Sequence, residues 1–229
     1  MNTLLLLLWK SPQTAEATIT SLEPLVFQNK IALIQECKNG PQVGPNVIPM
    51  LGERGYQIIK EKDNIGIGRA MNRLVNAADT RLVTFIEEDW RVVGDAVLPG
   101  KFMKESELAV ASGRADLVRL RSRNSHGWPY YGYGETSETH LLNSIHWLGR
   151  SEFDNRIWVE GEIAYTHARH ANWTNNPFVS AREFLLKEVL PFCNGSGVAL
   201  ETDIQSDWEK RDHIIGQHMV GIFRHQRID

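Results

Sequence analysis

An unbroken run of five leucines occupies residues 4–8, close to the start of the chain, and ends at Trp9 and Lys10. The run is too short to cross a bilayer, and it has neither the basic flank nor the small-residue cleavage site of a secretory signal. Side chains alternate between the two faces of a strand, so an uninterrupted apolar run indicates a strand buried on both faces. We therefore expect residues 3–9 to form an inner strand of a parallel sheet.

The rest of the first half alternates between strand and helix patterns. Further strands are expected at residues 30–37, 56–62 and 81–89, with helices at 14–26 and 64–79 and a Gly- and Pro-rich loop at 38–51. Ser11 or Thr14 is the expected cap of the first helix. Strands joined by helical crossovers predict an α/β fold with a mostly parallel, doubly wound sheet flanked by helices.

The second half does not show this regular alternation of strand and helix patterns. We expect a helix at 94–113, a strand at 116–122, an aromatic loop at 124–140, helices at 175–192 and 203–219, and a final strand and tail at 220–229. No repeat or low-complexity linker interrupts the chain, so residues 1–229 are expected to form one domain. Further domains of a longer polypeptide remain compatible with this pattern.

Composition limits the classes of binding partner and the cellular compartment that we expect. A net charge of -3 and a pI near 6.3 give no basic footprint, so no nucleic-acid partner is expected. Cys37 and Cys193 form no CxxC pair, which favours a reducing compartment and a cytoplasmic location. No stretch is long and apolar enough for a transmembrane segment.

Four polar segments follow the four expected strands of the first half: WKSP, ECKNG, DNIGIGRAMN and EEDW. In open α/β sheets, ligands bind at the carboxyl ends of the strands, so these segments should converge. Gly66 and Gly68 permit close backbone approach to an anion at a helix start, and Arg69 adds a positive charge. The third glycine of a dinucleotide fingerprint is missing, which disfavours a dehydrogenase, and a helix start without ligand stays open for this segment alone.

The acidic triplet Glu87, Glu88 and Asp89 ends the fourth strand and is followed by Trp90. Strand alternation would place Glu87 and Asp89 on one side and Glu88 on the other. Carboxylate oxygens suit a hard cation such as Mg2+ or Mn2+, which in turn neutralises a diphosphate. The alternative is a solvated acidic loop.

The order of TITSLEP, NIGIGRAMN and FIEEDW resembles the glycosyltransferases of GT-A fold, in particular the family 2-like enzymes. In these, an Asn-x-Gly-x5-Asn helix, here Asn64, Gly66 and Asn72, precedes a DxD-type metal motif. The first acid is Glu where Asp is commoner, and the resemblance is strongest over the first hundred residues. It implies a nucleotide-sugar half at residues 1–100 and a smaller, C-terminal acceptor half at 101–229.

The resemblance also assigns roles to residues. It implies that Asp89 binds Mn2+ or Mg2+, that His225 completes the metal shell, and that Glu87 lies nearer the ribose or sugar, while His213 and His218 fall in a helix pattern and are not expected to act. The donor-binding set that it implies is Trp9, Lys10, Ser11, Glu36, Asn64, Gly66, Arg69, Asn72, Glu87, Glu88 and Asp89.

A catalytic base is expected in ALETDIQSDW, where the family carries an acidic motif at a helix start. Glu201 and Asp203 are both candidates, because Thr202 separates them; a helix cap is the alternative for this segment. Asn176 is either an acceptor contact or a cap. In the aromatic loop, Trp128, Tyr130, Tyr131 and Tyr133 suit stacking on a sugar, or alternatively a hydrophobic cluster.

The resulting hypothesis is a metal-dependent glycosyltransferase that moves a hexose from a nucleoside diphosphate sugar, with a UDP-sugar favoured, to a hydroxyl of a glycan or glycoconjugate, with inversion. A sugar-phosphate nucleotidyltransferase is disfavoured because the segment after the first strand lacks the expected glycines. A non-catalytic carbohydrate-binding protein of the same fold is the third alternative.

Overall fold

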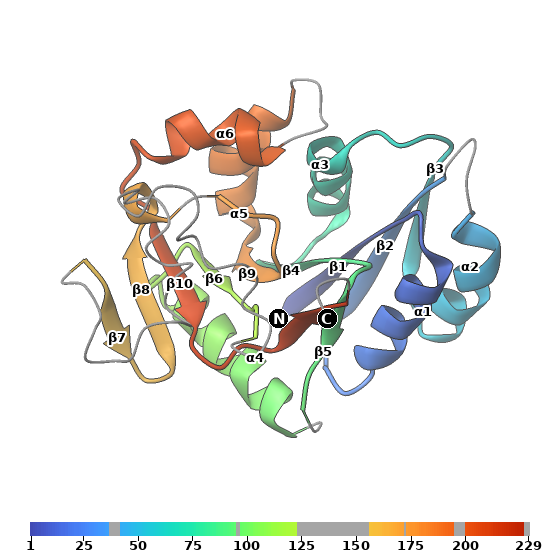
Figure 1. Ribbon diagram of the computed structural model, residues 1–229, viewed down its shortest axis with the longest axis horizontal. Helices are drawn as coiled ribbons and strands as arrows, with labels where there is room; N and C mark the ends of the chain where they lie inside the picture. The colour runs from blue at the N-terminus through green and yellow to red at the C-terminus, as the bar shows by residue number, and fades with distance from the viewer. Residues whose placement is uncertain (37–41, 95–96, 123–155, 172, 195–199, 227–229) are drawn as a thin grey trace.

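The computed structural model describes residues 1–36, 42–94, 97–122, 156–171, 173–194 and 200–226 (Figure 1). Within this part of the chain, nine strands form one sheet in the order β3-β2-β1-β4-β9-β6-β10-β8-β7. Their bounds are β1 Asn2–Trp9, β2 Asn29–Gln35, β3 Gln57–Glu61, β4 Leu82–Glu87, β6 Leu117–Arg119, β7 Trp158–Glu160, β8 Ile163–His167, β9 Phe178–Ala181 and β10 Ile214–His218. A separate two-stranded ribbon pairs β5 (Trp90–Val92) with β11 (Phe223–His225).

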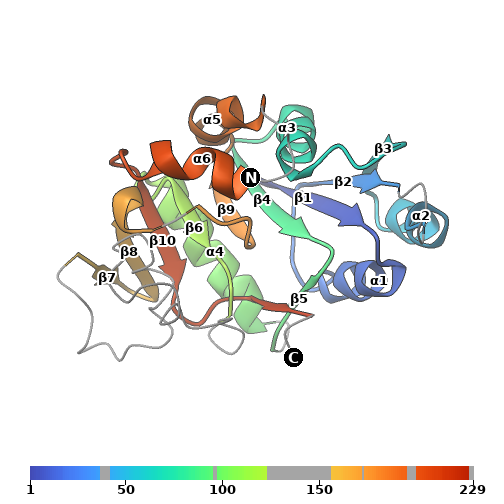
Figure 2. The same cartoon turned by 45° about the horizontal axis from the view of Figure 1, so that its top comes forward.

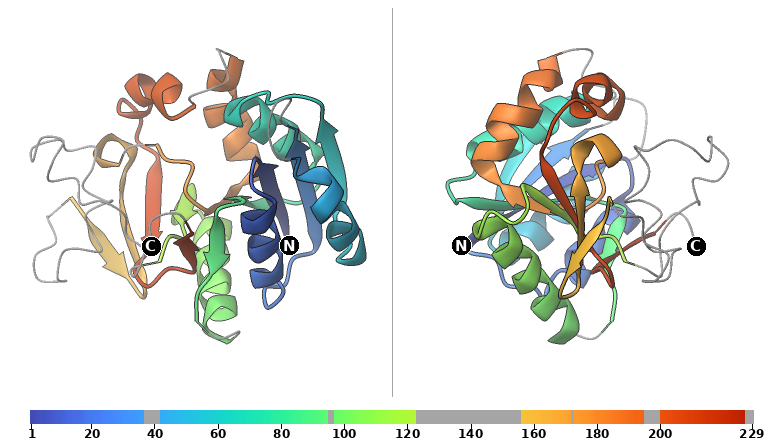
Figure 3. Two further views of the ribbon diagram at one scale, coloured as in Figure 1. Left: turned by 45° about the vertical axis from the view of Figure 1, so that its right-hand side comes forward. Right: turned by 90° about the vertical axis from the view of Figure 1, so that its left-hand side faces the viewer.

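Helices cover both faces of the large sheet. Their bounds are α1 Pro12–Ser21, α2 Gly44–Glu53, α3 Ile67–Ala77, α4 Val97–Ala111, α5 Arg182–Phe184, η5 Ala168–His170, η6 Leu185–Val189, η7 Leu190–Asn194 and α6 Leu200–Trp208. The right-hand view of Figure 3 shows α5 and α6 above the strands and α4 below them. No helix in the described ranges combines the length and the apolar character needed to span a bilayer.

The parallel character of the sheet is confirmed. β1 pairs in parallel with β2 and β4, and β2 with β3. Past β4, the strand β9 runs antiparallel between β4 and β6, and β8 runs antiparallel between β10 and β7. The fold is therefore α/β, with a mostly parallel sheet whose antiparallel strands lie in the C-terminal half.

The leucine run explains the layering. Leu4, Leu6 and Leu8 belong to the core shared with α1, α2 and α4, whereas Leu5 and Leu7 belong to the core shared with α3 and α6. All five are at most 3% exposed. Burial of one leucine side chain contributes about 1.5–3 kcal/mol, so this strand anchors both hydrophobic layers.

A helix occupies part of the segment expected to be a Gly- and Pro-rich loop. Val43, Val47 and Leu51 recur every four residues and are fully buried, which gives α2 an apolar stripe. Pro45 stands in the first turn, where its missing N–H costs no helical hydrogen bond, and Pro49 is tolerated inside this short helix. Packing of the stripe outweighed the two prolines and the glycines.

The predictions of two helices in the second half are partly wrong. The segment 175–192 begins with β9, because Phe178 and Val179 enter opposite hydrophobic layers, as neighbouring residues of a strand do. The segment 203–219 ends its helix at Trp208 and continues as β10, so His213 and His218 are not helical. Because β9 and β10 are short, the charged residues beside them dominate the sequence pattern, which therefore predicted helices.

Candidate active site

A cavity of about 530 Å³ lies at the carboxyl ends of β1, β2 and β4, the edge at which ligands bind in α/β sheets. Segments far apart in the sequence meet there, from both halves of the chain. Its lining comprises Leu7, Trp9, Gln35, Asn64, Gly66, Ile67, Glu87, Glu88, Asp89, Trp90, Arg121, Asn175, Asn176, Glu201 and His225.

All three acids of the triplet line this cavity, but in a different geometry from the one expected. β4 ends at Glu87, and Glu88 and Asp89 form a turn into β5, so strand alternation does not extend to Asp89. Glu88 is 5% exposed and accepts a hydrogen bond from the backbone N–H of Trp9 (3.0 Å). Its carboxylate therefore ties the turn to the end of β1.

His225 and Asp89 are neighbours. The imidazole Nε2 lies 3.3 Å from Oδ2 of Asp89, and both side chains are mostly buried. The register of β11 against β5 places His225 opposite Trp90, whose ring meets the imidazole edge-on at 4.9 Å. Figure 2 shows β11 and β5 side by side at the margin of the main sheet. The ribbon thus carries the histidine to the acidic turn.

The turn between β10 and β11 requires a glycine. Gly221 has φ +72°, and a Cβ at this position would collide with the carbonyl group of Arg121. We expect Gly221→Ala to lower the free energy of unfolding by about 3 kcal/mol or more, because a left-handed backbone and a backbone clash both oppose it. Urea unfolding monitored by circular dichroism measures the loss.

Gly113 and Gly161 provide matched controls for this substitution. Both have positive φ, but a Cβ at either would meet nothing within 4 Å. Their alanine variants should lose only about 1–2 kcal/mol, the cost of the left-handed conformation. A loss at Gly221 no larger than at these two positions would contradict the clash.

His218 holds the same turn from within the core. It is 0% exposed, and its Nδ1 accepts the backbone N–H groups of Val220 (3.3 Å) and Gly221 (3.1 Å), while Nε2 lies 3.3 Å from Oε2 of Glu105. An Nδ1 that accepts two hydrogen bonds carries no proton, so the ring is neutral with its hydrogen on Nε2. Burial lowers the pKa of His218 below its ordinary value. Glu105 and Glu162 act in the opposite direction and raise this pKa, whereas Lys101 lowers it further.

This lowered pKa predicts a pH dependence of stability. Between the folded-state pKa and the ordinary value of about 6.5, the unfolded chain binds more protons than the folded one, so stability falls as the pH drops. We expect the free energy of unfolding to decline below about pH 6.5, and to decline less steeply in His218→Asn, which keeps an acceptor near the position of Nδ1. Parallel profiles of the two proteins in urea titrations from pH 7.5 to 5 would exclude His218 as a source.

The residues at the acidic turn fit a divalent cation held jointly by protein and ligand. Within the described part of the chain, no group of three or more His, Cys, Asp or Glu side chains could by itself hold a metal ion. Asp89 and His225 nevertheless place one carboxylate and one imidazole together. Mg2+ and ions of similar preference commonly use one or two carboxylates and take the remaining oxygens from phosphates and water, so this pair suits a cation that arrives with a phosphorylated ligand.

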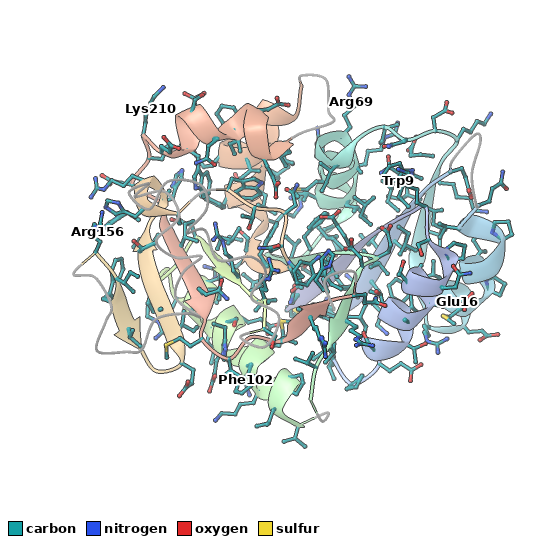
Figure 4. The ribbon with its side chains drawn as sticks, viewed as in Figure 1. Trp9, Glu16, Arg69, Phe102, Arg156 and Lys210 are labelled. Atoms are coloured by element: carbon teal, nitrogen blue, oxygen red, sulfur yellow. The ribbon has the colours of Figure 1, made fainter. Side chains whose placement is uncertain are left out.

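The start of α3 forms another wall. Gly66, at φ +81°, donates its N–H to Oδ1 of Asn64 (2.8 Å), and Ile65 donates to Oε1 of Gln35 (2.6 Å). Arg69 is exposed at the tip of α3 and does not line the cavity (Figure 4), and Asn72 accepts hydrogen bonds from Asn76 one turn later. The structure therefore brings Asn64 and Gly66 to the site, but neither Arg69 nor Asn72.

The end of β1 supplies Trp9 to the cavity lining, and Lys10 and Ser11 follow it in the chain. Lys10 has φ +70°, a conformation that no other non-glycine residue of the described chain adopts, and its ammonium lies 3.7 Å above the Trp9 ring. Backbone strain of this kind often occurs at functional sites. Ser11 caps α1 by accepting the N–H of Thr14 (3.4 Å). Neither Lys10 nor Ser11 lines the cavity.

Glu36 follows β2 and also lies outside the lining set. Its backbone N–H donates to the carbonyl of Glu61 (3.0 Å), and its carboxylate packs against Gly44, where a Cβ would collide with it. One carboxylate oxygen is buried and has no hydrogen-bond partner in the described part of the chain. Glu36 thus lies beside α2, outside the cavity lining.

Glu201 separates from Asp203 in the structure. Both lie in the first turn of α6, but only Glu201 lines the cavity, and its Oε1 accepts the backbone N–H of Asn175 (2.7 Å). The helix is fixed by a hydrogen bond from Trp208 Nε1 to the carbonyl of Ala171 (2.7 Å) and one from Trp173 N to Gln205 (3.0 Å). Of the two acids, only Glu201 therefore reaches the cavity.

Three polar lining residues were not expected, namely Gln35, Arg121 and Asn175. Gln35 ends β2, and Arg121 follows β6 with its guanidinium carbon 5.2 Å from the centre of the Trp90 ring. A polar residue at the end of an apolar strand was the signal available for Gln35, as it was for the acidic triplet. Trp128, Tyr130, Tyr131 and Tyr133 lie outside the described residues.

Comparison with known proteins identifies the fold. No protein-family model matches the sequence, and no curated protein matches it. Similar solved structures include S. aureus TarS 1–349 (TM-score 0.59, 9% identity, 98% of this chain and 60% of that one). Glucosyl-3-phosphoglycerate synthase from Mycobacterium tuberculosis gives a TM-score of 0.56 at 18% identity, covering 98% and 71% of the two chains.

A third similar structure is the mannosyltransferase PcManGT from Pyrobaculum calidifontis, with a TM-score of 0.58, 8% identity and coverage of 93% of this chain and 53% of that one. The chain thus spans just over half the length of TarS 1–349 and of PcManGT. At these identities the likeness concerns the fold alone. The chain has the fold of the GT-A glycosyltransferases.

Proposed function

We propose that this protein is a metal-dependent glycosyltransferase that transfers a hexose from a nucleoside diphosphate sugar to a hydroxyl group of a glycan or glycoconjugate. The observation that carries this proposal is the convergence of Asp89, His225 and Glu201 on one cavity at the ligand-binding edge of a GT-A sheet. An Asp–His pair that suits a cation and a separate carboxylate in the same cavity match the two needs of the reaction, a stabilised leaving group and a deprotonated acceptor.

Asp89 and His225 are the residues that would hold Mn2+ or Mg2+. When bound, such a cation supplies Lewis-acid stabilisation of the departing diphosphate. On the protein side, Asn64, Gly66 and the start of α3 position the donor, with Trp9 and Gln35 at the nucleoside end. In this proposal Glu87 faces the ribose or sugar, and Arg121 contributes a positive charge among the acidic lining residues.

Glu201 is the proposed base. It removes the proton from the acceptor hydroxyl as the oxygen forms a bond to the anomeric carbon and the bond from that carbon to the diphosphate oxygen breaks, with its electron pair leaving on the diphosphate. Direct displacement of this kind inverts the anomeric centre. The hydrogen bond from Asn175 fixes the carboxylate at Oε1 and so orients it toward the cavity wall formed by Asn175 and Asn176.

The similar structures support the choice of donor. TarS has been crystallised with UDP and with UDP-GlcNAc, glucosyl-3-phosphoglycerate synthase with Mn2+ and UDP, and PcManGT with GDP-Man and Mn2+. A nucleoside diphosphate is common to these complexes, whereas the base and sugar differ. A UDP-sugar is our proposed donor class.

The decisive test is binding and turnover of a panel of UDP- and GDP-sugars with Mn2+. We expect thermal stabilisation by one nucleotide in the presence of Mn2+ but not after chelation, and slow Mn2+-dependent hydrolysis of the matching donor. Nucleotide and sugar binding without hydrolysis or transfer would favour a non-catalytic carbohydrate-binding protein. Failure of every nucleotide to bind with Mn2+ would overturn the proposal.

A further inference from the structure

Gln226 connects three segments of the site through its side chain and backbone. Its Nε2 donates to Oγ1 of Thr18 (2.8 Å), and also approaches the carbonyl oxygens of Thr14 (3.3 Å) and Glu88 (3.4 Å). Its backbone N–H donates to the carbonyl oxygen of Asp89 (2.7 Å). The residue directly after His225 is thereby bonded both to α1 and to the acidic turn.

Thr18 determines which group donates in its hydrogen bond with Gln226. It is 0% exposed, and its hydroxyl donates its single proton to the carbonyl of Glu88 (2.5 Å). The hydroxyl must therefore accept from Gln226, so the N–H₂ end of the Gln226 amide, and not its oxygen, faces Thr18. Buried networks in which each polar group has a partner hold a single geometry more strictly than apolar contacts do.

The acidic turn is thus held from both sides. The carbonyl of Glu88 is bound by Thr18, the carboxylate of Glu88 binds Trp9, and the carbonyl of Asp89 is bound by Gln226. None of these bonds uses the carboxylate of Asp89 or the imidazole of His225. The network therefore fixes the main chain that carries the two groups and leaves their 3.3 Å contact facing the cavity.

We propose that Gln226, acting through Thr18, is a positioning residue that preorganises Asp89 and His225 for cation binding. The inference rests on the proposed function in that it takes the cation to bind with a nucleoside diphosphate. Preorganisation raises affinity because the ordering is completed before the ligand arrives. Gln226 and Thr18 contribute no ligand atom themselves, so their loss should weaken the cation site without removing it.

Near-isosteric variants test this role. Gln226→Met and Thr18→Val each remove one side of the hydrogen bond at similar side-chain volume, whereas Thr18→Ser keeps the hydroxyl. We expect the dissociation constant of Mn2+ in the presence of UDP, measured by calorimetry at 10 °C, to rise about tenfold in the first two variants and to stay near the wild-type value in Thr18→Ser. Gln13→Met, an exposed position on the same helix, is the matched control and should leave it unchanged.

The outcomes separate this inference from the proposed function. Unchanged Mn2+ affinity in Gln226→Met and Thr18→Val, with only a lower melting temperature, would reduce the network to a structural role and overturn the inference. If the wild-type protein binds no Mn2+ with UDP, the proposed function fails, and a metal-free measurement decides the positioning role. The ¹⁵N-resolved imidazole signals of His225, assigned with His225→Gln, should then shift in Thr18→Val and not in Thr18→Ser or Gln13→Met; identical spectra would reject it.

Discussion

Asp89→Asn should remove Mn2+-dependent transfer, with an expected loss of about a thousandfold or more. The substitution keeps the size of the side chain but replaces a charged oxygen pair by a neutral amide beside His225. A thousandfold loss corresponds to about 4 kcal/mol of transition-state stabilisation, within the several kcal/mol that a metal ion supplies to a developing charge. Initial rates at saturating donor and a Mn2+ titration with UDP should both show the defect.

Asp207→Asn is the control for this experiment. Asp207 lies on α6 in a surface ion pair with Lys210 (3.6 Å) and does not line the cavity. Because exposed ion pairs contribute about 0–1 kcal/mol, this variant should match the wild-type protein in rate and stability. If Asp89→Asn retains wild-type turnover and Mn2+ affinity, the cation is bound elsewhere or is not used.

Glu201→Gln should give the second largest effect, and of a different kind. The neutral amide of the variant cannot take the acceptor proton, whereas the Asp89–His225 pair, which makes its contact independently of Glu201, is unaltered. We expect transfer to fall by about 10²–10⁴-fold, the usual contribution of a positioned general base, while the dissociation constant of UDP with Mn2+ stays within about twofold of the wild-type value. Single-turnover rates and nucleotide binding measured on the same preparation separate the two quantities.

Asp203→Asn provides the matched comparison two residues along the same helix. Asp203 is exposed and absent from the cavity lining, so its variant should retain transfer. Loss of transfer in Asp203→Asn with normal activity in Glu201→Gln would reverse the assignment. Full activity of both variants would place the base outside these two residues.

The N-terminal half was largely predictable because one physical rule governs it. Residues 4–8 must be buried on both faces, and parallel strands then direct their carboxyl ends, with Trp9, Gln35 and Glu87, to a common edge. The acidic triplet lies at that edge and lines the cavity. The sequence alone did not show that the triplet bends into a turn after Glu87, since local pattern does not distinguish a strand end from the first residue beyond it.

The C-terminal half was less predictable because its strands are short. β9 contributes four residues between β4 and β6, and their strand character comes from the two hydrophobic layers that they join rather than from a long alternating pattern. No local pattern could rank Glu201 above Asp203 either, because both acids lie in the first turn of the same helix. Their difference arises from how Trp208 and Gln205 seat α6 on the segment before β9.

The ribbon of β5 and β11 has a consequence for folding of the protein. Every strand of the nine-stranded sheet precedes β11 in the chain, and β11 carries the imidazole that meets the acidic turn. Ile222 and Phe223, just before this imidazole in the chain, are fully buried in the hydrophobic layer that Leu4, Leu6 and Leu8 share with α1, α2 and α4. Closure of that layer and arrival of His225 at the acidic turn should therefore occur in the same step of folding.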